Sequence, residues 1–170
     1  MEGIVNRVEK SGLIQFNLED FLEGQEFELY DIKDNLFQEM IIREKDLREF
    51  VKTNDWSVYK GKHIGIYCST DAIIPTWAYM LLITALKPYA ASVSVTENKK
   101  RLVSSFLLNT LQRHDFTQYQ DGKVVIKGCS DVELSEQVYG ELTNKLMPYA
   151  KIIMFGEPCS TVPIYKKKKE

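Results

Sequence analysis

The chain has 170 residues, of which 44% are hydrophobic and 27% charged, and its formal net charge is −2. These values are typical of one soluble globular domain, or of one domain with a small N-terminal appendage. They exclude the basic balance of nucleic-acid-binding domains, and no apolar run reaches the roughly 18 residues of a membrane span. The first residues lack the basic and apolar regions of a signal peptide, so we expect a cytoplasmic protein with reduced thiols.

The first 60 residues predict a small N-terminal element packed on the main domain. Residues 1–25 show little periodicity. Residues 26–32 alternate charged and apolar side chains, and residues 37–43 read as a second strand beyond a turn at Asp34-Asn35. We therefore expect an antiparallel β-hairpin, followed by an amphipathic helix over residues 44–54.

From residue 61 onward, strands and helices alternate. The predicted strands are 63–67, 92–96, 124–127 and 151–155, and the predicted helices are 72–86, 99–112 and 134–146. Asp71 is expected to cap the first of these helices, which is apolar nearly all round. Residues 61–165 thus predict an α/β domain, and the lysine-rich residues 166–170 predict a flexible basic tail.

Two stretches of this domain resemble each other. The phrase Leu-x-Pro-Tyr-Ala at residues 86–90 recurs at residues 146–150, and the Cys-Ser phrase at Cys68 recurs at Cys129. We interpret this as a duplicated βαβ unit, which produces parallel strands. We expect one open, mainly parallel four-stranded sheet of order 2-1-3-4, in which the strands that end at Cys68 and Cys129 are neighbours.

The three cysteines predict a site at one edge of this sheet. Cys68, Cys129 and Cys159 each follow a predicted strand and precede a serine. Because the carboxyl ends of parallel strands share an edge, we expect the three thiols to meet there. Three thiolates suit zinc or an iron–sulfur species. The acidic residues expected at the same edge, any of which would complete a zinc site, are Asp71, Asp131, Glu157 and Glu97.

The same edge allows interpretations that do not involve a metal. Ser69, Ser130 and Ser160, with the two aspartates, would contact a small anion at the helix N-termini, in a binding module or an enzyme. A redox or nucleophilic cysteine is another reading, although His63 and His114 are expected at the opposite end of the sheet. Buried packing of the cysteines, and a structural interaction module that works through the hairpin, also stay open.

Four stretches carry a resemblance to a known family. They are residues 31–48, 68–80, 124–131 and 154–165, so the resemblance covers nearly the whole chain. The sequence resembles the family catalogued as domain of unknown function 2480, which is found mostly in Bacteroidetes. The resemblance implies no established activity. It implies an association with genes for iron–sulfur cluster assembly, and so an accessory role in iron–sulfur or sulfur metabolism with an unknown protein or small ligand as partner.

Overall fold

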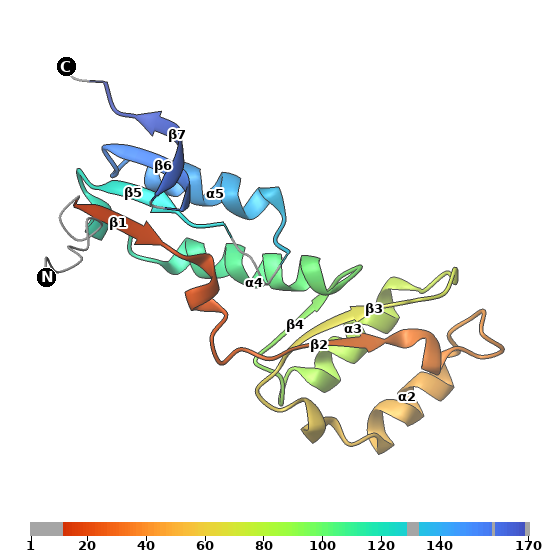
Figure 1. The fold of residues 1–170 in the computed structure, drawn as a ribbon. Helices are drawn as coiled ribbons and strands as arrows, with labels where there is room; N and C mark the ends of the chain where they lie inside the picture. Colours follow the sequence, from red (N-terminus) through yellow and green to blue (C-terminus); the bar gives the residue numbers. More distant parts are fainter. Residues whose placement is uncertain (1–11, 129–132, 158, 169–170) are drawn as a thin grey trace, which may run out of the picture. The chain divides into compact units, whose positions relative to one another are not determined.

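The computed structural model describes residues 12–128, 133–157 and 159–168, and the chain forms two compact units. Unit 1 comprises residues 1–23 and 104–170, and unit 2 comprises residues 24–103. Unit 2 is therefore an insertion in the sequence of unit 1. Figure 1 shows that each unit has a β-sheet and helices of its own. The boundary expected near residue 60 lies inside unit 2.

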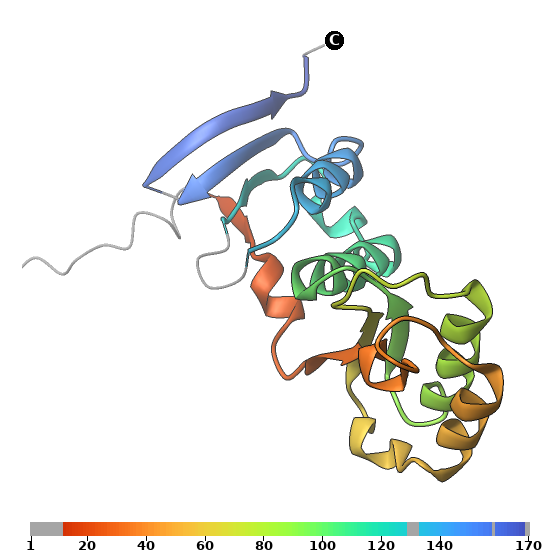
Figure 2. The same ribbon diagram turned by 90° about the vertical axis from the view of Figure 1, so that its right-hand side faces the viewer.

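Unit 2 is a parallel sheet with two helices on one face. Its strands run in the order β2-β3-β4, and its helices α2 and α3 connect them in sequence. Because the strand order advances in one direction, two right-handed crossovers place both helices on the same side, as Figure 2 shows. The bounds are β2 (Phe27–Asp31), α2 (Glu44–Thr53), β3 (His63–Tyr67), α3 (Thr76–Leu86) and β4 (Ser92–Val95).

Unit 1 contains a four-stranded sheet of order β1-β5-β6-β7. The first three strands are parallel, and β7 is antiparallel to β6. This confirms the predicted α/β class and the mainly parallel four-stranded sheet. The boundary between the units falls within α4. The bounds are β1 (Leu13–Phe16), α4 (Lys99–Arg113), β5 (Lys123–Ile126), α5 (Glu136–Leu146), β6 (Ile152–Glu157) and β7 (Ser160–Lys166).

The predicted repeat is present, and its period is constant. β5, α5 and β6 begin 60 residues after β3, α3 and β4, respectively. The turn before the first strand repeats as well: the Gly61 N–H donates to the Tyr89 carbonyl at 3.1 Å, and the Asp121 N–H donates to the Tyr149 carbonyl at 2.9 Å. Gly61 and Asp121 both have a positive φ. A residue between this turn and the end of β4 in unit 2 thus has its structural equivalent 60 positions later in unit 1.

The repeat extends to the aromatic clusters beneath the sheets. In unit 2, Tyr30 from β2 contacts Trp56 and Tyr59, and in unit 1 Phe16 from β1 contacts Phe116 and Tyr119. In both units the aromatic pair comes from the 3₁₀ turn that precedes the central strand. Each unit is therefore completed by an N-terminal strand that lies beside its own βαβ segment.

The expected strand order is wrong for this reason. β3 and β5 belong to different sheets, because β2 pairs with β3 and β1 pairs with β5. In neither unit does the strand order reverse among the parallel strands. The predicted switch point between the strands ending at Cys68 and Cys129 therefore does not exist.

The expected hairpin is also wrong. Residues 27–31 form a strand as predicted, but β2 pairs in parallel with β3. Residues 37–43 contribute only an isolated antiparallel bridge between Phe37 and Ile41. Gln38 and Glu39 between them have positive φ, so the chain reverses direction directly after Phe37.

Three boundaries differ from the prediction. α3 begins at Thr76 rather than near Asp71, because a proline at position 75 disfavours helical backbone at the residue before it. The sequence patterns predict neither β1, which lies in the poorly periodic residues 1–25, nor β7, which lies between the last predicted strand and the tail. The tail is attached as far as Lys167, whose N–H donates to the Lys151 carbonyl at 2.9 Å. Within the described residues, no helix has the length and apolar character that a membrane crossing requires.

Candidate functional site

The structure places the predicted thiols in two separate units. Cys68 follows β3 in unit 2 and is partly buried, whereas Cys159 is exposed in the connection between β6 and β7 of unit 1. Cys129, Ser130 and Asp131 lie outside the described residues. The constant period makes Gly128, not Cys129, the equivalent of Cys68. The expected common sheet, on which the meeting of the three thiols depended, is therefore not found.

The metal prediction finds no support in the described residues. Among residues 12–128, 133–157 and 159–168, no three histidine, cysteine, aspartate or glutamate side chains are grouped so that they could hold a metal ion. Glu97 instead pairs with Arg101 at 3.3 Å, and Glu157 faces Ser160 in the β6–β7 ladder. A zinc or iron–sulfur cofactor stays a prediction from the sequence.

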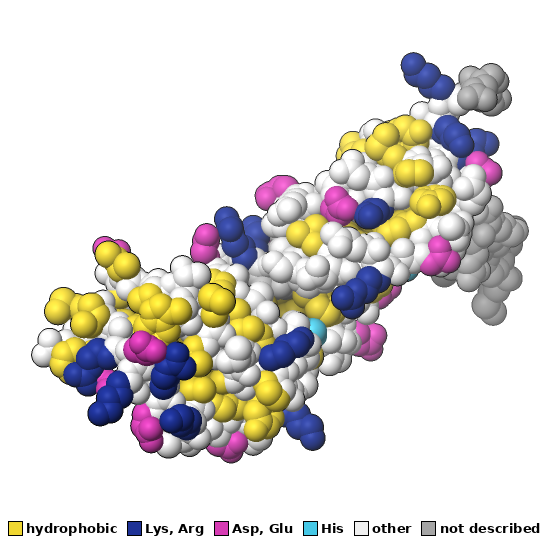
Figure 3. Space-filling model, turned by 180° about the vertical axis from the view of Figure 1, so that it is seen from behind, with side chains coloured by type: hydrophobic (Ala, Val, Ile, Leu, Met, Phe, Trp, Pro, Cys, Tyr) yellow, Lys and Arg dark blue, Asp and Glu magenta, His cyan; other side chains and the backbone are white. Residues whose placement is uncertain are grey.

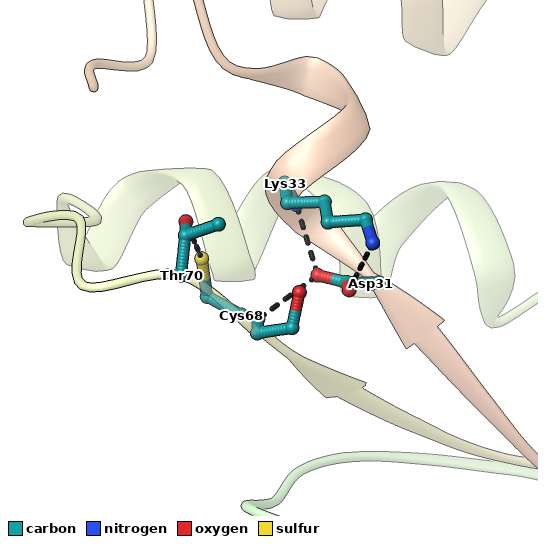
Figure 4. A network of polar contacts seen from close by, with 5 residues as sticks. Asp31, Lys33, Cys68 and Thr70 are labelled. Atoms are coloured by element: carbon teal, nitrogen blue, oxygen red, sulfur yellow. Dashed lines mark hydrogen bonds and ion pairs between the residues drawn. The ribbon is translucent and has the colours of Figure 1, made fainter. Parts of the chain in front are cut away.

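Cys68 lies in a small polar cluster at the carboxyl end of β3 (Figure 4). Its sulfur is 3.3 Å from the Thr70 hydroxyl. On the helix side it packs against the core of unit 2, and its sulfur is close enough to Tyr79 that burial and the thiol together raise the pKa of that tyrosine. The thiol is therefore enclosed by one hydroxyl, one phenol and the core.

Asp31 is the hub of this cluster. Its carboxylate accepts the backbone N–H groups of Lys33 and Ser69, each at 3.1 Å, and the Lys33 ammonium lies 3.6 Å away. Burial opposes ionisation of Asp31, but the hydrogen bonds from Ser69 and Lys33 outweigh it and lower its pKa. Burial and the Asp31 charge raise the pKa of the neighbouring Tyr67. The cluster ties the end of β2 to the loop after β3.

In this arrangement Asp31 already binds the Ser69 N–H, which is a group that an anion at this edge would need. The Ser69 N–H hydrogen-bonds to the Asp31 carboxylate at 3.1 Å. A carboxylate at the centre of the edge also repels a bound anion. Asp71 is exposed in the same loop and Ser160 starts β7 in the other unit. The Asp31 contacts hold the end of β2 to the loop after β3, and an anion site at this edge stays a prediction from the sequence.

Both histidines have structural partners. His63 begins β3, is buried, and places its ring nitrogens 2.7 Å from the Ser92 hydroxyl and 2.9 Å from the Gln25 side-chain oxygen. His114 lies against Tyr119 in the aromatic cluster of unit 1. Burial lowers the pKa of both rings. His63 begins β3, whereas Cys68 follows the other end of that strand.

A feature that the sequence interpretation did not identify as a site is the outward face of α3. The repeat supplies an internal reference, because α3 and α5 share one burial pattern at every position except Trp77 and its equivalent Gln137. The three fully buried positions are apolar in both helices. The remaining positions differ: the polar or glycine residues Gln137, Gly140, Glu141, Thr143 and Lys145 of α5 correspond to Trp77, Met80, Leu81, Ile83 and Ala85 of α3.

α3 is therefore apolar at positions where an equivalent helix in the same chain is polar, and of these residues Trp77, Leu81, Ile83 and Ala85 are partly buried against the core of unit 2. Met80 is 62% exposed, and Ile73 in the preceding loop is 91% exposed. Figure 3 shows hydrophobic side chains gathered over unit 2, at the lower left. The signal in the sequence is the nearly uniform apolarity of residues 72–86, which predicts a helix that is buried nearly all round or packs under another element.

The class that emerges is an α/β protein built from two structurally repeated units, each with helices against a sheet whose strands are parallel except for β7. The family model described as Protein of unknown function (DUF2480) matches residues 2–167. The chain belongs to this family, as the resemblance implied. No curated protein and no solved structure matches the chain.

Proposed function

We propose that the chain is a structural interaction module that works as a homodimer, in which the α3 helices of two copies pack together. The observation that carries this proposal is the contrast between α3 and α5. Both helices have nearly the same burial pattern, yet α3 carries tryptophan, methionine and leucine where α5 carries glutamine, glycine and glutamate. Met80 and Ile73 leave apolar side chains in solvent, next to the partly buried Trp77 and Leu81, and a partner helix would cover them.

The spacing of these residues favours a helix as the occupant. Trp77, Met80, Leu81 and Thr84 follow the i, i+3, i+4, i+7 spacing of one helical stripe. In an antiparallel pair related by a two-fold axis between Met80 and Leu81, Trp77 of one copy lies opposite Thr84 of the other. A large side chain thus meets a small one at both ends, and the stripe is complementary to itself.

Charge at the ends of the helix supports the same partner. Lys87 follows α3 directly, and Asp71 is in the loop that precedes it. Both side chains are exposed. In the antiparallel arrangement each lysine lies toward the aspartate of the other copy, and the helix dipoles oppose each other favourably. Because α3 itself carries no charged residue, nothing on the stripe opposes the approach of a second copy.

The repeat also supplies the substitutions that test the proposal. Trp77→Gln and Leu81→Glu give α3 the residues of α5 at two partly buried positions, and the same fold already tolerates these residues in α5. We expect the double variant to keep the circular dichroism spectrum of the parent and to sediment as a single chain. The parent is expected to sediment as a dimer over the same concentration range.

The matched control is Val58→Gln. Val58 is 58% exposed in unit 2, and its equivalent in unit 1 is Gln118. This change also replaces an apolar residue with its polar equivalent from unit 1, but it lies outside the α3 stripe. The variant should therefore remain dimeric. Equal sedimentation of the parent, the α3 double variant and the control would reject α3 as the interface.

A further inference from the structure

Unit 1 contains an open groove beside α5. It has a volume of about 320 Å³, and its walls are mostly apolar. The groove lies between α5 and the last two strands of the sheet. Its lining residues are Ile126, Glu136, Tyr139, Gly140, Thr143, Phe155 and Ile164.

Gly140 keeps this groove open. It lies in the middle of α5, where glycine is unfavourable, and a Cβ added there would meet no atom within 4 Å. The equivalent residue in α3 is Met80, whose side chain would extend into the space. The open volume is therefore a local property of unit 1 and does not follow from the shared fold.

Two aromatic rings form one end of the groove. Tyr139 and Phe155 have ring centroids 5.6 Å apart and an interplanar angle of 89°. Phe155 is 38% exposed, so its ring is accessible from solvent. The face of an aromatic ring carries negative electrostatic potential and attracts cations, above all alkylated ammonium groups whose methyls also prefer apolar walls.

Glu136 is the charged residue in the lining, and it is exposed in the first turn of α5. A carboxylate beside two aromatic rings and an apolar wall complements a cation that has an apolar body. The equivalents of Glu136 and Phe155 in unit 2 are Thr76 and Val95, so neither the charge nor the second ring is repeated there. The combination is specific to this groove.

We propose that the groove binds a small organic cation of the alkylated ammonium class. The cationic head lies against Glu136 and the aromatic rings, and the apolar portion occupies the space above Gly140. This proposal is independent of the α3 interface, because every lining residue belongs to unit 1.

Choline chloride and its neutral isostere 3,3-dimethyl-1-butanol are the probes, titrated into the full-length chain with backbone amide resonances as the readout. We expect choline to shift the Gly140 and Phe155 resonances to saturation, and the isostere to bind at least about tenfold more weakly because it lacks the charge. Equal binding of the two probes would overturn the ammonium assignment, and so would the absence of saturation by choline.

Two variants keep the test separate from folding. Gly140→Met introduces the unit 2 residue, replaces glycine with a better helix former, and should abolish saturation while the protein stays folded. Glu136→Gln should weaken choline binding about fivefold, since a partly exposed charge contact is removed. Glu141→Gln alters an acid of the same helix that pairs with Lys145 and does not line the groove, and should bind as the parent does. Undiminished choline binding by the Gly140→Met protein would overturn the proposal.

Discussion

The carboxylate of Asp31, at the end of β2, accepts the backbone N–H of Ser69 in the loop after β3 at 3.1 Å. The same oxygen accepts the Lys33 N–H, so one side chain caps a 3₁₀ turn and anchors a loop 38 residues away. The Asp31 side chain is only 14% exposed. The edge that the sequence marked as a ligand site is thus held together by internal hydrogen bonds.

Asp31→Ala should destabilise unit 2 by about 1–2 kcal/mol, because two backbone N–H groups lose their acceptor. Asp31→Asn keeps an acceptor oxygen and should cost less than half of that. Chemical unfolding at neutral pH measures both values. If the alanine variant were as stable as the parent, the Asp31 contacts would contribute nothing to folding.

At Gly65, the addition of a single methyl group should destabilise the protein more than the loss of the Asp31 carboxylate does. A Cβ at Gly65 would lie 2.5 Å from a Thr96 methyl, 2.9 Å from Leu29 and 3.2 Å from Leu102. Gly65→Ala should therefore destabilise the protein by about 1–3 kcal/mol through overpacking. Gly140→Ala, where the added group meets no atom within 4 Å, should instead stabilise it by about 0.5–1 kcal/mol. A stabilising Gly65→Ala would contradict the close packing of α4 on β3.

The buried His63 and the half-buried His114 predict a dependence of stability on pH. Burial lowers the pKa of His63 and His114 in the folded protein, whereas the unfolded chain has the ordinary value of about 6.5. Between these values the unfolded chain binds more protons. Stability should thus be complete above about pH 6.5 and decline as the pH falls toward the folded-state pKa values.

Unfolding free energies measured between about pH 7.5 and pH 5.5 test this sign, in a range where carboxylates change little. The double variant His63→Asn/His114→Asn should have a lower stability at pH 7.5 but a flatter profile. A parent protein that becomes more stable on acidification across this range would show that the rings are not held in their neutral form.

Local sequence patterns predict most of the helices and strands. They do not predict which strands pair with each other. Residues 63–67 form a strand with the predicted bounds, and the helix over residues 99–113 ends one residue later than expected. The pairing of β2 and β1 with separate central strands depends on contacts remote in sequence. β1 has four residues and β7 contains Pro163, so both give weak strand signals.

For the candidate site as well, local patterns identify some residues and miss those whose contacts are remote in sequence. Strand ends identified Cys68 and Asp71 as edge residues, but the hub residue Asp31 looked like part of a hairpin. The Cys-Ser phrases at Cys68 and Cys129 are 61 residues apart, whereas the structural period is 60. The similarity of the two phrases therefore aligned two positions that are not structurally equivalent. The α3 surface became visible only when a second helix with the same burial pattern was available for comparison.

A cross-linking experiment tests the geometry of the proposed dimer. Position 80 lies next to the two-fold axis of the antiparallel pair, so two cysteines there come within disulfide distance. Met80→Cys should form a covalent dimer under mild oxidation to a greater extent than the parent with its three native cysteines. Val58→Cys, at another exposed apolar position, should give only the parental background.

The molar mass of the unmodified chain, measured by light scattering during size-exclusion chromatography at several concentrations, tests the central claim most directly. The self-complementary α3 stripe predicts twice the mass of one chain, with Leu81→Glu shifting the equilibrium toward a single chain. The mass of a single chain at every concentration, unchanged by the substitution, would contradict the proposal that α3 joins two copies.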